Sequence, residues 1–200
     1  MKAKPKILPY FPLSVFLFPG EDMPLRIFEP RYQQLIGDAR SSGITFVIPF
    51  LKDQEVQEFG CEVRLKEVVA ENPGGRMVIT VESLAIVQIL SYNKRIEGKL
   101  YPGGAVSRMP KSELLENQEL KELIRDYQDA YDNEFLNCCD RSRITRQDVM
   151  QALNLPSEDK FNFACLPGGV QKETYLIGQL RYLNMIRQQE IQLGNDFGLN

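Results

Sequence analysis

The residue types that most often carry catalysis are scarce in this sequence. It contains no histidine, which excludes Ser-His-Asp and Cys-His catalysis and any zinc site with a histidine ligand. No two of its four cysteines form a C-x-x-C pair, and the adjacent Cys138 and Cys139 cannot easily face one metal ion. We therefore expect no metal and no other cofactor. The cysteines, at positions 61, 138, 139 and 165, are interpreted as buried or half-buried thiols in a reducing cytosol, with a redox switch at Cys138-Cys139 as the alternative.

Neither a phosphate-binding loop nor a catalytic pair of carboxylates is indicated. Pro-Gly-Gly occurs at residues 73–75, 102–104 and 167–169, but none of these belongs to a nucleotide-binding motif, so they predict turns. The acidic residues between positions 113 and 134 lie on the polar face of a predicted helix, where no apolar pocket would raise a carboxyl pKa. We interpret them as a solvated face, with attraction of a partner as the alternative.

The most distinctive segment runs from Leu13 to Tyr32 and places charged residues among apolar ones, where unpaired charges would be costly. In one interpretation the charges pair with each other or cap a helix, and every aromatic side chain lies in the core. In the other, some aromatic and Met side chains reach the surface and bind apolar polypeptide segments, with the charges as a rim. The candidate polypeptide-binding residues are Phe16, Phe18, Met23, Arg26, Phe28, Glu29 and Arg31.

Short strands separated by Pro and Gly are predicted up to about residue 105. The predicted strands lie at residues 13–18, 44–51, 61–70, 77–90 and 92–101, and a second short strand is expected between the Pro19-Gly20 turn and the helix that Glu29-Pro30 opens. The third of them alternates apolar and polar residues, as a half-buried strand does, and the Asn72–Gly75 turn joins it to the fourth in a hairpin. We expect Pro102-Gly103-Gly104 to end the β section.

One helix is predicted inside this β section. Pro30 fits the first helical position after Glu29, and apolar residues follow at helical spacing until Gly43. The order of the elements indicates a closed or nearly closed sheet that is capped by one helix.

After Pro110 the apolar residues recur with helical spacing. The longest stripe consists of Leu120, Leu123, Ile124, Tyr127, Tyr131 and Phe135. Thr145 and Asp148 predict a capping box that opens a short helix, Ser157 can cap another through Cys165, and a last helix is expected from about residue 171 to 193. The second half is therefore predicted to be a small helical bundle.

The segment with the mixed charges resembles the opening of a known family, the Lon N-terminal domain, which is the substrate-binding region of the ATP-dependent Lon proteases. The matching residues are Leu13, Phe18-Pro19-Gly20, Pro24 to Tyr32, Leu35 and Ile36. Weaker matches follow at residues 60–63, 77–90, 171–177 and 181–183. The resemblance covers nearly the whole chain.

The resemblance implies an α+β fold, with a β-rich PUA-like lobe of about six strands and one helix, followed by a small helical bundle. We accordingly expect two domains, the β-rich PUA-like lobe at residues 1–105 and the C-terminal helical bundle at residues 106–200. The resemblance also implies that the chain holds polypeptide rather than cutting it. Neither the Walker motif of the Lon ATPase nor the Ser-Lys pair of the Lon protease occurs in the 200 residues, so we expect a stand-alone, non-catalytic Lon-domain protein.

Three functions from different classes follow, of which the first is favoured. It is a module that binds exposed apolar segments of client proteins, by apolar patches or by strand addition at a sheet edge. The second is a PUA-like RNA-binding module, against which the net charge of -3 argues, although residues 71–110 carry five basic and three acidic residues. The third is a thiol-dependent enzyme that uses Cys138-Cys139. The expected partners are unfolded or partly folded client polypeptides, with a protease or chaperone as a further candidate.

Membrane association is not expected. The chain has no window of 18 uninterrupted apolar residues, and Pro9, Pro12 and Pro19 break the apolar run that follows its basic start. We expect a cytoplasmic protein.

Overall fold

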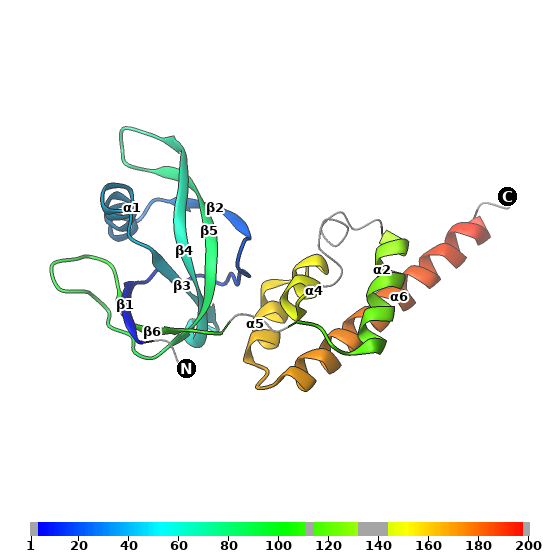
Figure 1. Cartoon of the computed structure of the whole chain (residues 1–200). Helices are drawn as coiled ribbons and strands as arrows, with labels where there is room; N and C mark the ends of the chain where they lie inside the picture. The colour runs from blue at the N-terminus through cyan, green and yellow to red at the C-terminus, as the bar shows by residue number, and fades with distance from the viewer. Residues whose placement is uncertain (1–3, 111–113, 132–143, 198–200) are drawn as a thin grey trace. The chain divides into compact units, whose positions relative to one another are not determined.

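The computed structural model describes residues 4–110, 114–131 and 144–197. It divides into two compact units (Figure 1). The β-rich unit consists of Met1–Pro110 together with Pro156–Cys165, and the helical unit consists of Lys111–Leu155 together with Leu166–Asn200. The predicted stripe residue Phe135 and the Cys138-Cys139 pair lie outside the described residues.

The β-rich unit is built on an antiparallel sheet. Its strands are β1 (Lys6–Pro9), β2 (Asp22–Ile27), β3 (Phe46–Lys52), β4 (Glu55–Glu71), β5 (Met77–Ile89) and β6 (Gly103–Arg108). The strand order is β1-β6-β5-β4-β3, and β2 pairs with the first half of β5, on the edge that β6 occupies farther along. The predicted α+β fold with about six strands and one helix in this part of the chain is confirmed.

The chain that follows β1 brings the two ends of the sheet together. Tyr10 and Leu13 form parallel bridges with Val47 and Phe50 of β3, and the N–H of Phe11 donates to the carbonyl of Val47 at 2.8 Å. Because β1 itself pairs with β6 at the other end, this segment closes the sheet, as the order of the elements predicts.

Helix α1 (Pro30–Ser42) covers one end of this sheet (Figure 1). It begins as predicted, with Glu29 at the N-cap and Pro30 at the first helical position, where the missing N–H of proline costs nothing. It ends at Gly43, whose φ of 65° suits glycine. Its buried side chains, which pack into the main core, are Tyr32, Leu35, Ile36 and Ala39.

Two predicted strands are wrong. Residues 13–18 form no strand and are largely unpaired, because the N–H groups of Leu17 and Phe18 donate to the Cys61 sulfur and the Glu21 carboxylate instead of a neighbouring strand. Residues 92–101 form turns, and the strand begins at Gly103, where the sequence had predicted its end. Gly103 and Gly104 lie in the strand and not in a turn, because the chains approach so closely at Gly104 that a Cβ atom there would lie 2.0 Å from the Ser91 carbonyl oxygen.

Helix α5 (Ser157–Cys165) belongs to the β-rich unit although it comes from the helical half of the sequence. Phe161 lies within 5.7 Å of the Phe16 ring centroid and packs in the same core cluster. Lys160 forms an ion pair with Glu21 at 2.7 Å, and Lys52 of β3 pairs with Glu158. The predicted boundary at residue 105 assigns this helix to the helical bundle instead.

The described residues of the helical unit form α2 (Gln118–Tyr131), α4 (Arg146–Ala152) and the long α6 (Gly169–Phe197), with α2 and α4 both packed against α6. The predicted capping box is present, since Asp148 accepts from the Thr145 N–H at 2.8 Å and Thr145 accepts from the Asp148 N–H at 3.2 Å. The buried apolar side chains include Leu120, Ile124, Val149, Met150, Leu176 and Leu180.

Candidate functional site

The seven candidate residues fall into a buried and an exposed group. Phe16 and Phe18 are 0% and 1% exposed, and the Phe16 ring meets Phe18, Phe50 and Phe161 edge to face with centroids 5.7–6.1 Å apart. Met23 is half-buried against the same core. These three side chains support the fold from within, and neither Phe16 nor Phe18 is accessible to a ligand in this structure.

The other four candidates lie at the surface, at the junction of β2 and α1. Phe28 is 64% exposed, and Arg26 is exposed as well. Arg31 donates from Nε and Nη2 to one carboxylate oxygen of Glu29 at 2.8 Å, and its guanidinium lies 4.6 Å from the centroid of the Tyr32 ring. Glu29 and Arg31 therefore pair with each other, as one interpretation holds, while Arg26 has no ion-pair partner among the described residues and an aromatic side chain reaches the surface, as the other interpretation holds.

The pairing of β2, β5 and β4 brings Arg26 beside residues from two other strands. Arg26 is the Cα partner of Val78, and Val78 is the Cα partner of Ala70, so the three form a row across the sheet. Side chains in such a row project from the same face. Leu25 and Ile27, the neighbours of Arg26 on β2, are buried, so this row is on the outer face.

Phe28 and Arg76 extend this outer face toward the tip of the β4–β5 hairpin. Each lies two residues from a member of the row, Phe28 from Arg26 and Arg76 from Val78, and residues two apart on extended chain share a face. Asn72 holds the hairpin turn, since its side-chain oxygen accepts the backbone N–H groups of Gly74 and Arg76 at 3.0 Å.

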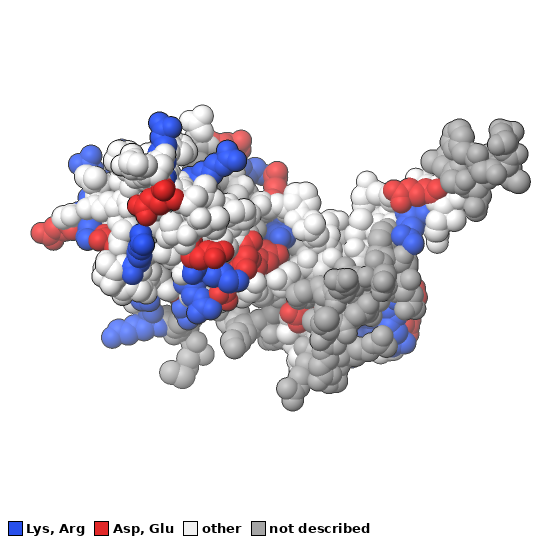
Figure 2. Space-filling view, turned by 90° about the horizontal axis from the view of Figure 1, so that it is seen from above, with Lys and Arg blue, Asp and Glu red and all other residues white. Residues whose placement is uncertain are grey.

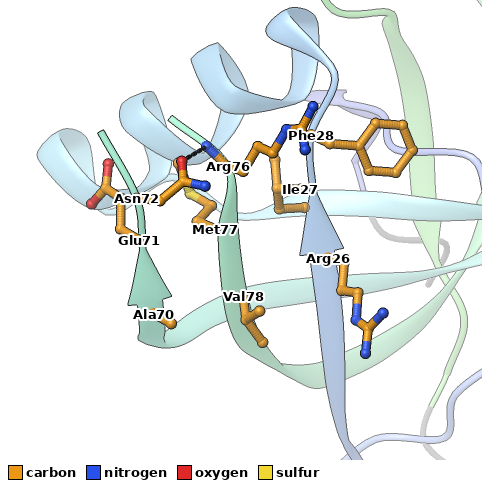
Figure 3. A pocket seen from close by; sticks show the side chains of 9 residues that line it. All are labelled: Arg26, Ile27, Phe28, Ala70, Glu71, Asn72, Arg76, Met77 and Val78. Carbon is orange, nitrogen blue, oxygen red and sulfur yellow. Dashed lines mark hydrogen bonds between the residues drawn. The ribbon is translucent and has the colours of Figure 1, made fainter. Parts of the chain in front are cut away.

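A pocket of about 540 Å³ opens at this place (Figure 3). Its lining residues are Arg26, Ile27, Phe28, Ala70, Glu71, Asn72, Arg76, Met77 and Val78. We call the outward-facing set of Arg26, Phe28, Ala70, Arg76 and Val78 the Phe28 face. It combines aliphatic and aromatic carbon with two guanidinium groups.

Three members of the Phe28 face were not among the candidates from sequence. Ala70, Arg76 and Val78 belong to the hairpin that the Asn72–Gly75 turn predicts, so their strands could be found from the sequence. Their proximity to Phe28 depends on the pairing of β2 with β5, which no local pattern specifies.

The free edge of β2 is a poor template for a further strand. Among the described residues β2 pairs with β5 alone, but Pro24 in its middle has no N–H to donate. Asp22 pairs with Lys66 at 2.5 Å, which adds charge along the same strand. Of the two recognition modes considered from sequence, side-chain contacts on the Phe28 face thus fit the geometry better than strand addition at β2.

The buried polar groups near the core have structural roles. Burial raises the pKa of the Cys61 thiol to about 12, so it is a weak nucleophile at neutral pH. Burial would also raise the pKa of Glu62, but hydrogen bonds from Arg108 at 2.5 Å and Thr45 at 2.8 Å outweigh it, so the pKa is lowered. Cys165 is half-buried, which agrees with the interpretation of the cysteines at the two positions described.

Charge and metal-ligand patterns on the described residues point to no other site. No group of three or more Cys, Asp or Glu residues among them is placed to hold a metal ion. Figure 2 shows Lys and Arg mixed with Asp and Glu on the visible face of the β-rich unit, without the continuous basic surface that nucleic-acid binding favours. No described helix is both long and apolar enough to cross a membrane.

Comparison with known proteins identifies the class of domain. Residues 7–191 match the model of the ATP-dependent protease La (LON) substrate-binding domain, so the chain belongs to this family, and the resemblance seen in the sequence is confirmed. No curated protein matches the chain in sequence.

Two solved structures share the fold. A Lon N-terminal domain protein from Xanthomonas campestris is 20% identical, with a TM-score of 0.65 over 86% of this chain and 98% of that one. The N-terminal domain of the Mycobacterium avium complex Lon protease is 16% identical, with a TM-score of 0.62 over 88% of this chain and 98% of that one.

Proposed function

We propose that this chain is a non-catalytic module that binds exposed apolar segments of unfolded or partly folded proteins, with the Phe28 face as the contact surface. The observation that carries the proposal is the 64% exposure of Phe28 beside a pocket with an aliphatic lining. An exposed aromatic side chain next to a concave apolar surface is typical of protein-binding sites. The family to which the chain belongs is defined by substrate binding, which supports the same function.

The candidate residues have different roles in this proposal. Phe28 and Arg26 contact the client, and the Glu29–Arg31 pair, which follows Phe28 directly, forms the rim. The buried Phe16 and Phe18 and the half-buried Met23 act indirectly, because they fix the core on which β2 lies.

The expected affinity for a single segment is low. Burying one large apolar side chain contributes about 1.5–3 kcal/mol, whereas a micromolar dissociation constant corresponds to about 8 kcal/mol. Val78, Ala70 and the aliphatic stems of the two arginines must therefore supply much of the remaining contact. A client would gain affinity by presenting several segments to several copies of the module.

Substitution of Phe28 tests the contact surface. Phe28→Ala should weaken binding of a fluorescein-labelled neutral peptide with a Phe-Leu-Phe centre by about tenfold or more, measured by fluorescence anisotropy. The melting temperature should not change, because the side chain is exposed in the free protein. Leu90→Ala is the matched control, since it removes an exposed apolar side chain just beyond the other end of β5.

Two outcomes would refute this assignment. Unchanged affinity in Phe28→Ala would place the client surface elsewhere. A lower melting temperature with intact binding would make Phe28 a folding element.

The absence of catalysis has its own test. The purified chain should neither hydrolyse ATP nor cleave casein, because the sequence has no phosphate loop and no nucleophile-base pair. Hydrolysis that persists in the Cys138→Ala/Cys139→Ala variant and copurifies with the chain would contradict a purely binding role.

A further inference from the structure

Two arginines on the Phe28 face differ from their neighbours in having no carboxylate partner. Neither Arg26 nor Arg76 forms an ion pair or a side-chain hydrogen bond with any described residue, although both are exposed beside a pocket. Other arginines around this part of the sheet do have partners. The pairs are Arg31–Glu29 at 2.8 Å, Arg40–Glu71 at 3.2 Å and Arg64–Glu82 at 2.6 Å.

The one carboxylate that lines the pocket is already engaged. Glu71 accepts from Arg40 of α1, and in Figure 3 the guanidinium groups of Arg26 and Arg76 both lie away from it. The Phe28 face therefore carries two positive charges that no described side chain neutralises. They flank Val78, since Arg26 is its Cα partner across the sheet and Arg76 lies two residues before it on β5.

We propose that Arg26 and Arg76 make the module selective for apolar segments that are flanked by aspartate or glutamate. The inference rests on the proposed function, because it specifies the client of the same surface. A guanidinium group binds a carboxylate with two parallel hydrogen bonds, and arginine is enriched in protein interfaces for this reason. A client that lacks acidic residues leaves both groups solvated, and one with flanking lysines is repelled.

The spacing of the two arginines suits a short segment. Arg26 and Arg76 are diagonal neighbours across the β2–β5 pair, because Val78 is the Cα partner of Arg26 and Arg76 lies two residues before Val78, so they are about 7–8 Å apart. One apolar client side chain can then lie against Val78 and Phe28, while acidic residues two positions before and after it, which project from the same side of an extended segment, reach toward Arg26 and Arg76. Charge complementarity of this kind sets preference and orientation, and the apolar contact supplies the common part of the affinity.

The expected effect is modest and depends on salt. An exposed carboxylate–guanidinium contact should change the dissociation constant by about twofold to fivefold. Two contacts should therefore separate an acidic from a neutral peptide by about fourfold to twenty-fivefold in 25 mM salt. The difference should nearly disappear in 500 mM salt, where screening acts over only a few ångströms.

The test uses three fluorescein-labelled peptides that share one Phe-Leu-Phe centre and carry amidated C-termini. Their flanking residues are glutamate, glutamine or lysine, and anisotropy titrations of the full chain give the three dissociation constants. The glutamate peptide should bind most tightly and the lysine peptide least. The Arg26→Gln/Arg76→Gln variant should bind all three with the affinity that the wild type has for the glutamine peptide.

A charge-matched variant separates local contacts from net charge. Arg64→Gln/Arg95→Gln removes the same two charges from exposed positions of the β-rich unit that do not line the pocket, and it should keep the wild-type order. Melting temperatures of both variants serve to show that the fold is intact.

The possible failures are distinguishable. If no peptide binds, the proposed function itself is refuted. If the peptides bind without regard to charge, or if Arg26→Gln/Arg76→Gln keeps the order, the client preference is overturned while the Phe28 contact stands. Two further results would also overturn it. If a glutamine peptide with a free C-terminus bound as tightly as the glutamate peptide, a terminal carboxylate would be the ligand. If the chain self-associated in sedimentation and the Arg26→Gln/Arg76→Gln variant did not, a second copy of the chain would be the partner.

Discussion

The ring of Phe161 stacks on the ring of Phe50, with 4.6 Å between the centroids and an angle of 26° between the planes. Phe50 is on β3, and Phe161 is on α5, more than a hundred residues later in the chain. Phe16 meets both rings edge to face, so three segments that are distant in sequence share one aromatic cluster. The cluster makes α5 part of the β-rich unit.

Removal of one ring from this cluster should destabilise the β-rich unit. Phe161→Ala deletes a side chain that is 7% exposed, and truncation of a buried phenylalanine costs about 3–5 kcal/mol because it leaves a cavity. Urea denaturation that is followed by circular dichroism should show this loss. Phe28→Ala, which removes the same atoms from the surface, should change the free energy of unfolding by less than about 0.5 kcal/mol. Equal effects of the two substitutions would contradict the assignment of α5 to this core.

The placement of α5 marks a limit of prediction from sequence. The helix itself follows from the sequence, because Ser157 and helical spacing up to Cys165 indicate it. The element against which the helix packs cannot be predicted in the same way, since Phe161 and Phe163 would suit the core of a helical bundle equally well. Long-range packing is decided by complementary shape and by pairs such as Lys160–Glu21, which leave no periodic pattern in the sequence.

The Lys160–Glu21 pair should be costly to break. The two side chains are 10% and 15% exposed, their charged atoms are 2.7 Å apart, and the second carboxylate oxygen of Glu21 accepts the N–H of Phe18 at 2.9 Å. Lys160→Met leaves the Glu21 carboxylate nearly buried without its counter-ion, which should cost about 3–5 kcal/mol of unfolding free energy. The Lys160→Met/Glu21→Gln variant should recover much of this loss, since an amide still accepts from Phe18 and needs no counter-ion.

An exposed pair in the same unit is the control for this prediction. Lys66 and Asp22 are 49% and 44% exposed, and such pairs contribute about 0–1 kcal/mol. Lys66→Met should therefore have little effect on urea denaturation. If Lys160→Met costs no more than Lys66→Met, the α5 pair has no role in holding the helix.

The contact between α1 and the loop after residue 95 should depend on pH. Asp38 of α1 accepts from Lys99 at 2.8 Å and from the Tyr101 hydroxyl at 2.6 Å, and these hydrogen bonds, that from Lys99 foremost, lower the pKa of the carboxyl group. A carboxyl whose pKa is lower in the folded than in the unfolded chain stabilises the fold above its unfolded pKa of about 4. That contribution is lost as the pH falls through the folded value.

The difference between the wild type and Asp38→Asn isolates this group from the other carboxylates. The variant should be less stable than the wild type at pH 6, and the gap should close as the pH falls from about 4 toward 2, measured by urea denaturation at each pH. Tyr101→Phe removes one of the two hydrogen bonds and should show a smaller dependence of the same sign. A gap that stays constant from pH 2 to pH 6 would mean that Asp38 acts through packing and not through its charge.

The candidate site was found in part from the sequence. The mixture of charged and aromatic residues between Leu13 and Tyr32 led to Phe28 and Arg26, because such residues need either partners or solvent. Alternation did not show which aromatic residues face outward, since Phe16 and Phe18 lie in an irregular segment where no period of two applies. Arg76 could not be found in this way, because nothing near it in the sequence is unusual.

Gly104 shows why the start of β6 was misplaced, and it provides a last test of the fold. A glycine pair after proline usually marks a turn, yet Gly103 and Gly104 are the first residues of β6. A Cβ atom on Gly104 would lie 2.0 Å from the carbonyl oxygen of Ser91 and 2.9 Å from the hydroxyl of Tyr10, so glycine is required here by close approach of the chains. The Tyr10 hydroxyl donates to that same carbonyl at 3.0 Å, which ties the start of the chain to this point.

Gly104→Ala should therefore destabilise the β-rich unit although it adds one methyl group. The Ser91 carbonyl is backbone and cannot move aside alone, so we expect a cost of at least about 1–3 kcal/mol, which corresponds to a fall of several degrees in melting temperature. Gly37→Ala is the matched control, because Gly37 lies inside α1 with no atom within 4 Å of an added Cβ. Alanine favours a helix by up to about 1 kcal/mol over glycine, so this variant should melt at the same or a higher temperature. If Gly104→Ala lowers the melting temperature while Gly37→Ala keeps or raises it, close approach of the chains, and not a turn, explains the glycine pair. An unchanged melting temperature in Gly104→Ala would mean that β6 can separate from Ser91 without loss of the fold.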